Sequence, residues 1–199
     1  MNVTLLFSRD HYLGAVEAYM RGLERRVEAG LSADVRSVAS LFVSRWDKAT
    51  MEKLPQKLRN TLGIAVGQQS YRAYRQLLAS DRWQRLENLG ARPQRLLFAS
   101  TGVKDPAAPD TLYVTALAAP NTVDTMPEET LLAFGDHGTL QGALGADGGN
   151  CEQALAAVAA AGVDLGALAA QLQKEGAESF NASWKNLLKS IETKSKALK

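Results

Sequence analysis

The chain has very few of the residues that build disulfide frameworks and zinc sites. Cys151 is the only cysteine among 199 residues, and the two histidines, His11 and His137, lie far apart in the sequence. A single thiol excludes a disulfide framework and a thiolate metal cluster. Two separated imidazoles do not supply the grouped ligands that zinc requires. The sequence therefore predicts no metal site.

Long apolar runs and a strong charge imbalance are also absent. No apolar run approaches the ~20 residues of a membrane span, and no signal peptide is visible. The net charge is only +2, with basic residues spread along the chain. Residues 185–199 are locally basic but lack interleaved aromatic residues on which bases could stack, which favours a solvated helix end. These absences argue against membrane and nucleic-acid partners, and we expect a cytoplasmic protein.

What the sequence does contain is typical of one globular domain. Apolar residues make up 46% of the chain and charged residues 22%, enough to bury a core. Short apolar runs at 1–8, 37–43, 94–100 and 121–126 predict strands, and stretches with helical periodicity lie between and after them. Such alternation predicts parallel strands with helical crossovers. An open doubly wound sheet and half of a (β/α)₈ barrel both fit this order.

The position of polar residues favours the barrel, because barrel ligands bind at the carboxyl ends of the strands. The buried run that starts at Ser37 leads directly into Ser44, Arg45 and Asp47. These residues place a hydroxyl, a guanidinium and a carboxylate at a strand's end. A second interpretation stays open from this stretch alone: Arg45 and Asp47 could form a solvated pair at the start of a helix.

Two other segments carry polar groups in positions that suit a ligand. Asn2 and Thr4 share one face of the first predicted strand, opposite Val3, Leu5 and Phe7, as in a strand that lines a polar pocket or an edge strand with one wet face. Thr101-Gly-Val-Lys-Asp-Pro106 follows the third strand and offers backbone amides, a hydroxyl and an ammonium, the groups that bind phosphate. Gly-Lys turns are common on protein surfaces, so this loop alone is not specific.

Four of these segments, taken in order, resemble successive strand motifs of transaldolases. They are Asn-Val-Thr-Leu-Leu-Phe-Ser, Ser-Val-Ala-Ser-Leu-Phe-Val-Ser-Arg, Leu-Phe-Ala-Ser-Thr-Gly-Val-Lys-Asp-Pro and Asn-Thr-Val-Asp-Thr-Met-Pro-Glu. The pattern is most similar to a bacterial branch that is sometimes fused to glucose-6-phosphate isomerase. The resemblance covers nearly the whole chain, including Asp136-His137-Gly138 and the closing helices.

The resemblance implies an α/β fold, namely the C-terminal half of a (β/α)₈ TIM barrel with extra C-terminal helices. Residues 1–136 would form about four βα units, strands 5–8 of the barrel, and residues 137–199 the closing helices. It also implies an enzyme of the pentose phosphate pathway that needs neither metal nor cofactor. Transaldolases move a dihydroxyacetone unit from sedoheptulose 7-phosphate or fructose 6-phosphate to an aldose phosphate through a Schiff base on a lysine.

Site residues follow from the resemblance, position by position. Asn2 and Thr4 would bind substrate hydroxyls and orient the catalytic water. Ser40 and Phe42 of the next strand would line the substrate pocket, and Arg45 would bind the substrate phosphate. Ser100 of the following strand and Lys104, a second cation for phosphate, would also bind substrate. The family's second cation is usually an arginine, and Lys104 is its best counterpart here.

The departure from the family is the nucleophile. In transaldolases the Schiff-base lysine lies on the fourth strand and the acid/base carboxylates on the first and third, all before the residues that match here. Lys48, Lys53 and Lys57 fall in a predicted helical region and should be solvated, and Lys104 lies on a loop. Two hypotheses follow. The chain is catalytic only when the missing half is supplied, or it is an inactive truncated homologue that binds sugar phosphates or a protein.

An open half barrel would leave two strand edges unpaired. The apolar face formed by Leu5, Phe7, Val38 and Leu97 would also lose part of its cover. The sequence therefore predicts a partner, which is either a separately supplied N-terminal half or a second copy of the chain.

Overall fold

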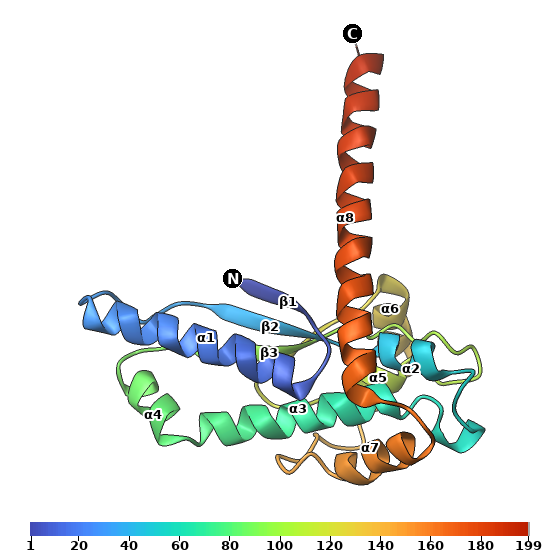
Figure 1. Ribbon diagram of the computed structural model, residues 1–199, viewed down its shortest axis with the longest axis horizontal. Coiled ribbons are helices and arrows are strands. Elements are labelled where there is room, and N and C mark those ends of the chain that lie inside the picture. The colour runs from blue at the N-terminus through green and yellow to red at the C-terminus, as the bar shows by residue number, and fades with distance from the viewer. Residues whose placement is uncertain (199) are drawn as a thin grey trace.

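Four parallel strands form the centre of the computed structural model, which describes residues 1–198 (Figure 1). The strands lie side by side in chain order: β1 (Asn2–Leu6), β2 (Ser37–Phe42), β3 (Gln94–Ala99) and β4 (Val123–Thr125). All three neighbouring pairs are parallel. Strands that neighbour one another in chain order and are joined through helices have the arrangement of a partial (β/α)₈ barrel. The predicted α/β class is confirmed.

Eight helices and one short 3₁₀ turn complete the described residues. They are α1 (Arg9–Glu28), α2 (Ser44–Thr50), η1 (Gln56–Leu58), α3 (Leu62–Leu78), α4 (Asp81–Asn88), α5 (Leu112–Ala116), α6 (Glu128–His137), α7 (Cys151–Ala160) and α8 (Leu165–Ala197). Side-chain caps fix several starts, since the Ser8 hydroxyl accepts the amide of His11 and the Ser80 hydroxyl that of Trp83. Local sequence thus sets where these helices begin.

One face of the sheet packs against helices and holds the core. Leu41, Leu96 and Phe98 project from β2 and β3 and are almost fully buried. Tyr12 of α1 meets Tyr74 of α3 edge to face, with ring centroids 6.2 Å apart. Large apolar and aromatic side chains thus fill the layer between sheet and helices, as in a packed α/β domain.

Strand β1 is irregular, and this changes which of its residues are buried. Leu5 has a φ of +60°, and the register with β2 shifts between Val3 and Leu6. The simple alternation predicted for this strand is therefore wrong beyond Thr4. Leu6 pairs with Leu41 and is buried, whereas Leu5 is half-buried. A left-handed residue inserts a bulge, and a bulge reverses the faces of the residues that follow.

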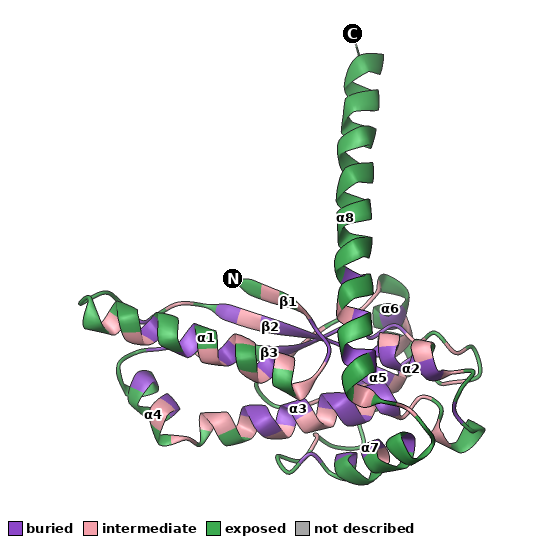
Figure 2. Ribbon diagram, in the orientation of Figure 1, coloured by how far each residue is buried: buried purple, intermediate pink, exposed green. Residues whose placement is uncertain are grey.

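The closing helix α8 leaves the body of the molecule and stands away from it (Figure 1). Only residues within 165–176 are buried, namely Leu168, Ala169, Leu172 and Gly176, and from residue 177 on the helix is exposed (Figure 2). The exposed part of α8 carries an apolar stripe that is not packed within the described residues: Phe180, Trp184, Leu187, Leu188 and Ile191. By length and composition, no single described helix could span a membrane; only α7 and α8 taken together, bent by 93°, would pass such a test.

Strands β1 and β4 are the two edges of the sheet, as the half-barrel interpretation predicts. The expected loss of cover over the other face is wrong for two of its four residues. Phe7 and Leu97 are buried within the chain itself, whereas Val38 and Leu5 are only half-buried. The Phe7 ring lies 5.3 Å from that of Phe42, and the start of α8 crosses above it.

Candidate functional site

The carboxyl ends of β2 and β3 are joined by a continuous set of hydrogen bonds. The amides of Val43 and Ser44 donate to the carbonyl oxygens of Ala99 and Ser100 at 2.9 Å, and the hydroxyl oxygens of Ser44 and Ser100 are also 2.9 Å apart. Ser100 has a φ of +58°. Left-handed backbone is unfavourable outside glycine and is concentrated at functional sites. The predicted site residue Ser100 thus occupies a strained turn, with Ser44 as a partner.

The guanidinium of Arg45 lies over an aromatic ring. Its Cζ atom lies 4.8 Å from the centroid of the Phe42 ring, within the range of a cation–π contact. Helix α8 passes close by, since a Cβ atom at Gly176 would lie 3.3 Å from Nη1 of Arg45. The guanidinium is half-buried rather than free in solvent. The structure thus brings together Phe42 and Arg45, two of the predicted binding residues.

Asp47 has a structural role and is not the partner of Arg45. Its carboxylate is 3% exposed and accepts the amides of Leu62 and Gly63, each at 3.0 Å, and the hydroxyl of Tyr113 at 2.9 Å. Burial raises the pKa of this carboxyl to about 6, and the hydrogen bonds from Tyr113 and the two amides oppose that rise. The interpretation of Arg45 and Asp47 as a solvated pair is therefore wrong. Asp47 caps α3 from a distance.

The two predicted residues of β1 differ in their surroundings. Ser40 is 2% exposed, and its hydroxyl donates to Oδ1 of Asn2 at 2.7 Å. Asn2 pairs in register with Val38, which places it on the face of the sheet that also carries Ser40. Thr4 lies further along the same strand and is exposed. Asn2 and Ser40 therefore form one polar unit on the face away from the core.

Lys104 is exposed on the loop after β3. A Cβ atom at Gly102 would lie 3.6 Å from its Nζ atom, so the side chain folds back over that glycine. Lys104 also lines a cavity of about 330 Å³ together with Lys48 and Lys53. Both of these lysines are exposed, in agreement with the prediction that they are solvated. The loop therefore contributes to a surface beside α2 that carries these three lysines and Glu52.

Sequence reasoning did not identify the contact that fixes this loop. The hydroxyl of buried Thr101 donates to Oδ1 of Asp124 at 2.7 Å. Burial raises the pKa of the Asp124 carboxyl to about 6, and the Thr101 hydrogen bond partly opposes this effect. The only signal in the sequence is a carboxylate inside a short predicted strand.

Two contacts from α8 were also missed. The side-chain amide of Gln173 donates to the carbonyl oxygen of Leu5 at 3.1 Å, at the bulge in β1. Three residues later Gly176 passes so close to β1 that an added Cβ would lie 2.8 Å from Cδ2 of Leu5. These residues are about 170 positions apart in the sequence, and no local pattern predicts their contact.

The assembled site has the groups for an anionic, hydroxylated ligand. Asn2 with Ser40, Phe42 with Arg45, and Ser44 with Ser100 form three contacting pairs, whereas Thr4 and Lys104 lie exposed beside them. Within residues 1–198, no three histidine, cysteine, aspartate or glutamate side chains are grouped as a metal would require. The hydroxyls, the amide and the guanidinium of these pairs can form hydrogen bonds with an anion and with hydroxyl groups.

Comparison with known proteins identifies the family to which the chain belongs. Residues 1–191 match the family described as transaldolase/fructose-6-phosphate aldolase. The chain is 43% identical to the transaldolase of Mycobacterium marinum over 208 residues, which covers 100% of this chain and 56% of that protein. It is also 43% identical to the transaldolase of Neisseria meningitidis, over 94% of this chain and 54% of that protein. The chain thus spans about half the length of the curated relatives it matches.

Proposed function

Because the chain belongs to the transaldolase/fructose-6-phosphate aldolase family, we propose that it supplies the substrate- and phosphate-binding groups of a transaldolase. The complete site would transfer a dihydroxyacetone unit from sedoheptulose 7-phosphate or fructose 6-phosphate to an aldose phosphate. Residues 1–136 would be the barrel portion of this unit and residues 137–199 the portion that closes it.

The observation that carries this proposal is the placement of Arg45. A guanidinium is planar and can bind phosphate through two parallel hydrogen bonds. Contact with Phe42 and α8 limits its freedom before any ligand arrives, so less conformational entropy is lost on binding. Lys104 would add a second cation from the adjacent loop. Asn2, Thr4, Ser40 and Ser100 would hold the sugar hydroxyls.

The proposed chemistry also requires a lysine that this chain does not place in its sheet. None of the four described strands contains a lysine. A Schiff-base lysine must be desolvated or lie near another cation, so that its amine is neutral. Lys48, Lys53, Lys57 and Lys104 are all exposed. The nucleophile of the proposed reaction would therefore come from a further barrel portion with which this chain combines.

The same observation favours a second candidate. A chain with binding groups and no buried lysine could bind sugar phosphates, or a protein, without turning anything over. Under this alternative Arg45 keeps its role as the phosphate ligand, but no covalent intermediate forms in any combination of chains.

Borohydride trapping separates the two. The chain is incubated with fructose 6-phosphate, reduced, and examined by intact mass for a covalent three-carbon adduct. We expect none on this chain alone. We expect one on a lysine of the part of the Mycobacterium marinum transaldolase that this chain does not match, once that part is co-expressed with the chain. An adduct on this chain alone would contradict the proposal, and no adduct in either sample would favour the binding-only alternative.

A binding measurement tests the role of Arg45 directly. R45Q removes the planar cation, and we expect fructose 6-phosphate to bind at least about tenfold more weakly, as measured by calorimetry. R85Q is the matched control, since Arg85 is exposed on α4 and should leave binding unchanged. Equal affinities for both variants would show that Arg45 is not the phosphate ligand.

A further inference from the structure

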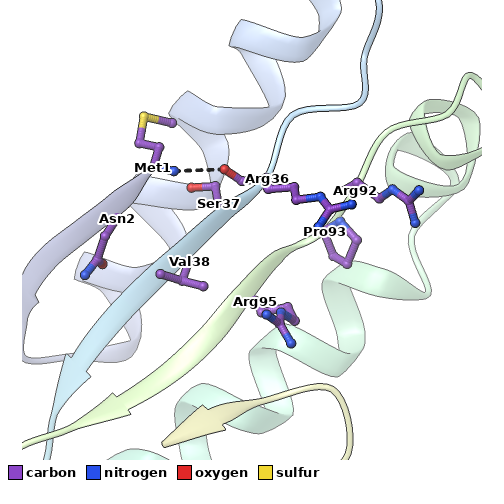
Figure 3. Close-up of a pocket in the computed structure, with 8 residues that line it drawn as sticks. All are labelled: Met1, Asn2, Arg36, Ser37, Val38, Arg92, Pro93 and Arg95. Carbon is purple, nitrogen blue, oxygen red and sulfur yellow. Dashed lines mark hydrogen bonds between the residues drawn. The ribbon is translucent and has the colours of Figure 1, made fainter. Parts of the chain in front are cut away.

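A second cavity lies at the opposite end of the strands from Arg45. It has a volume of about 710 Å³ and opens at the amino ends of β1, β2 and β3 (Figure 3). Three arginines are among its lining residues, which are Met1, Asn2, Arg36, Ser37, Val38, Arg92, Pro93 and Arg95. The side chain of Arg36 extends from the amino end of β2 toward Pro93 and Arg92, which precede β3 (Figure 3). Asn2 is the one lining residue that this amino-end cavity shares with the candidate substrate site, and its arginines are not part of that site.

The walls of the amino-end cavity are held by buried contacts. The hydroxyl of Tyr19 on α1 lies 2.7 Å from the carbonyl oxygens of both Val35 and Arg92. It therefore ties together the segments that lead into β2 and β3. Below them, the side-chain amide of Gln94 donates to the hydroxyl of Ser37 at 2.8 Å, in a buried position. The backbone segments that carry the three arginines are thus fixed by hydrogen bonds.

Only one of the three arginines has a carboxylate partner. Nε of Arg92 lies 3.0 Å from Oδ1 of Asp34. Within residues 1–198, no carboxylate lies within ion-pair distance of Arg36 or Arg95. Both side chains belong to exposed residues. Arg36 and Arg95 are therefore two cations without a carboxylate partner among the described residues.

Arg95 lies on the face of the sheet that a closed barrel would bury. Its neighbours Gln94 and Leu96 are buried toward the helices, so Arg95 projects from the opposite face, in register with Val38. The interior of an eight-stranded barrel is filled by side chains and contains no water-filled pore. A guanidinium moved into such an interior is strongly destabilising unless a carboxylate meets it.

A second copy of this chain cannot supply that carboxylate. In a closed parallel barrel the amino ends of all strands meet at one end. Two copies would place two Arg36 and two Arg95 side chains there. Among residues 1–198, the one acidic side chain paired at this cavity is Asp34, which already binds Arg92 in each copy. Like charges brought together in a low-dielectric interior repel strongly, so the cavity disfavours closure by self-association.

We propose that the amino-end cavity is a docking surface for a barrel portion other than a second copy of this chain. That partner adds parallel strands to the exposed edge of β1 and presents inward-facing carboxylates to Arg95 and Arg36. This inference rests on the proposed function, because it specifies the chemistry of the barrel portion that would complete the site. Charge complementarity at the end remote from the substrate then decides which polypeptide closes the barrel.

The test uses the full chain co-expressed with the part of the Mycobacterium marinum transaldolase that the chain does not match. Complex formation is measured by co-purification and by the dissociation constant of the purified pair. R95E reverses the charge that the partner would meet. R85E makes the same change in net charge at an exposed position on α4. We expect R95E to weaken the complex at least about tenfold and R85E to leave it unchanged. Thermal unfolding of each variant alone verifies that both fold.

Other results of this binding experiment would contradict either the docking surface alone or the proposed function as well. Equal affinity of the R95E and R85E variants for the partner would overturn the docking surface and leave the proposed function in place. A complex tightened by R95E would do the same and would indicate a basic partner. If the unchanged chain formed no complex at all, both the docking surface and the supply of the lysine by this partner would be wrong.

Discussion

Helices α3 and α8 are both long and amphipathic, yet α3 is largely buried and α8 is largely exposed. Helix α3 lies against the sheet and buries nine residues, among them Val66, Tyr71 and Tyr74. Helix α8 is nearly twice as long and buries four. Its apolar stripe projects beyond the body into solvent (Figure 2). An amphipathic pattern therefore predicts that one face of a helix is suited to burial, but it does not predict which part of the protein or which partner covers that face.

The two helices are also anchored differently. The start of α3 is capped by Asp47, which comes from a separate helix fifteen residues earlier. The start of α8 is capped by its own preceding residue, Asp164, which accepts the amide of Ala167 at 2.9 Å. Helix α3 thus depends on the tertiary structure from its first turn. Helix α8 needs only local sequence to begin.

The largest expected contrast is between two tryptophans. Trp83 on α4 belongs to the core at 1% exposure, whereas Trp184 on α8 is 60% exposed. We expect W83A to lower the free energy of unfolding by about 3–5 kcal/mol, because it opens a large cavity. W184A should change it by no more than about 0.5 kcal/mol. Urea unfolding followed by circular dichroism measures both. A large loss for W184A would mean that the stripe on α8 is already covered in solution.

The caps provide the next contrast. D47A leaves two amides and the hydroxyl of Tyr113 without their acceptor in a buried position. We expect a loss of about 2–3 kcal/mol. D164A removes an exposed local cap and should cost about 1 kcal/mol. Equal losses in urea unfolding would mean that Asp47 is no more than an ordinary helix cap.

Two glycines test how tightly each helix is packed. A Cβ atom at Gly67 of α3 would lie 2.8 Å from Cδ2 of Leu117, which is 1% exposed and has no room to move. G67V should therefore destabilise the chain by about 1–3 kcal/mol. At Gly176 of α8 the obstructing atom belongs to half-buried Leu5, which can turn aside. We expect G176V to cost less than about 1 kcal/mol, measured as thermal unfolding at fixed pH. A greater loss for G176V would reverse the ranking of the two contacts.

The smallest expected effect concerns pH and separates a carboxylate of the body from one on α8. Burial raises the pKa of Asp124 from 3.8 to about 6. A folded-state pKa above the unfolded value adds stability that is present below about pH 4 and lost as the pH rises through about 6. D124N should remove the share of this slope that Asp124 causes, which solvent screening of this partly exposed carboxyl limits to the order of 1 kcal/mol. Asp47, whose pKa is also raised to about 6, should keep its own share. E178Q, at an exposed position of α8, should retain the whole slope. An unchanged slope in the D124N variant would show that other groups cause it.

Much of the candidate site was accessible from the sequence because its residues lie within or just past short apolar strands. Arg45 and Ser100 come just past such strands, and Ser40 and Phe42 lie within the apolar run that becomes β2. The partners of these residues were not accessible. The contact of Ser40 with Asn2 depends on strand register, and the approach of Gly176 to Arg45 depends on where α8 crosses the sheet.

The sequence by itself determined the order of strands and helices, since local periodicity, caps and breakers act within a few residues. It also determined the family, through four motifs in fixed order. Only the tertiary structure decided that Asp47 is a buried cap, that Leu5 carries a bulge and that the stripe on α8 is left uncovered. Each of these outcomes depends on groups far apart in the chain, and desolvation and packing act on distances in space, which the order of residues does not specify.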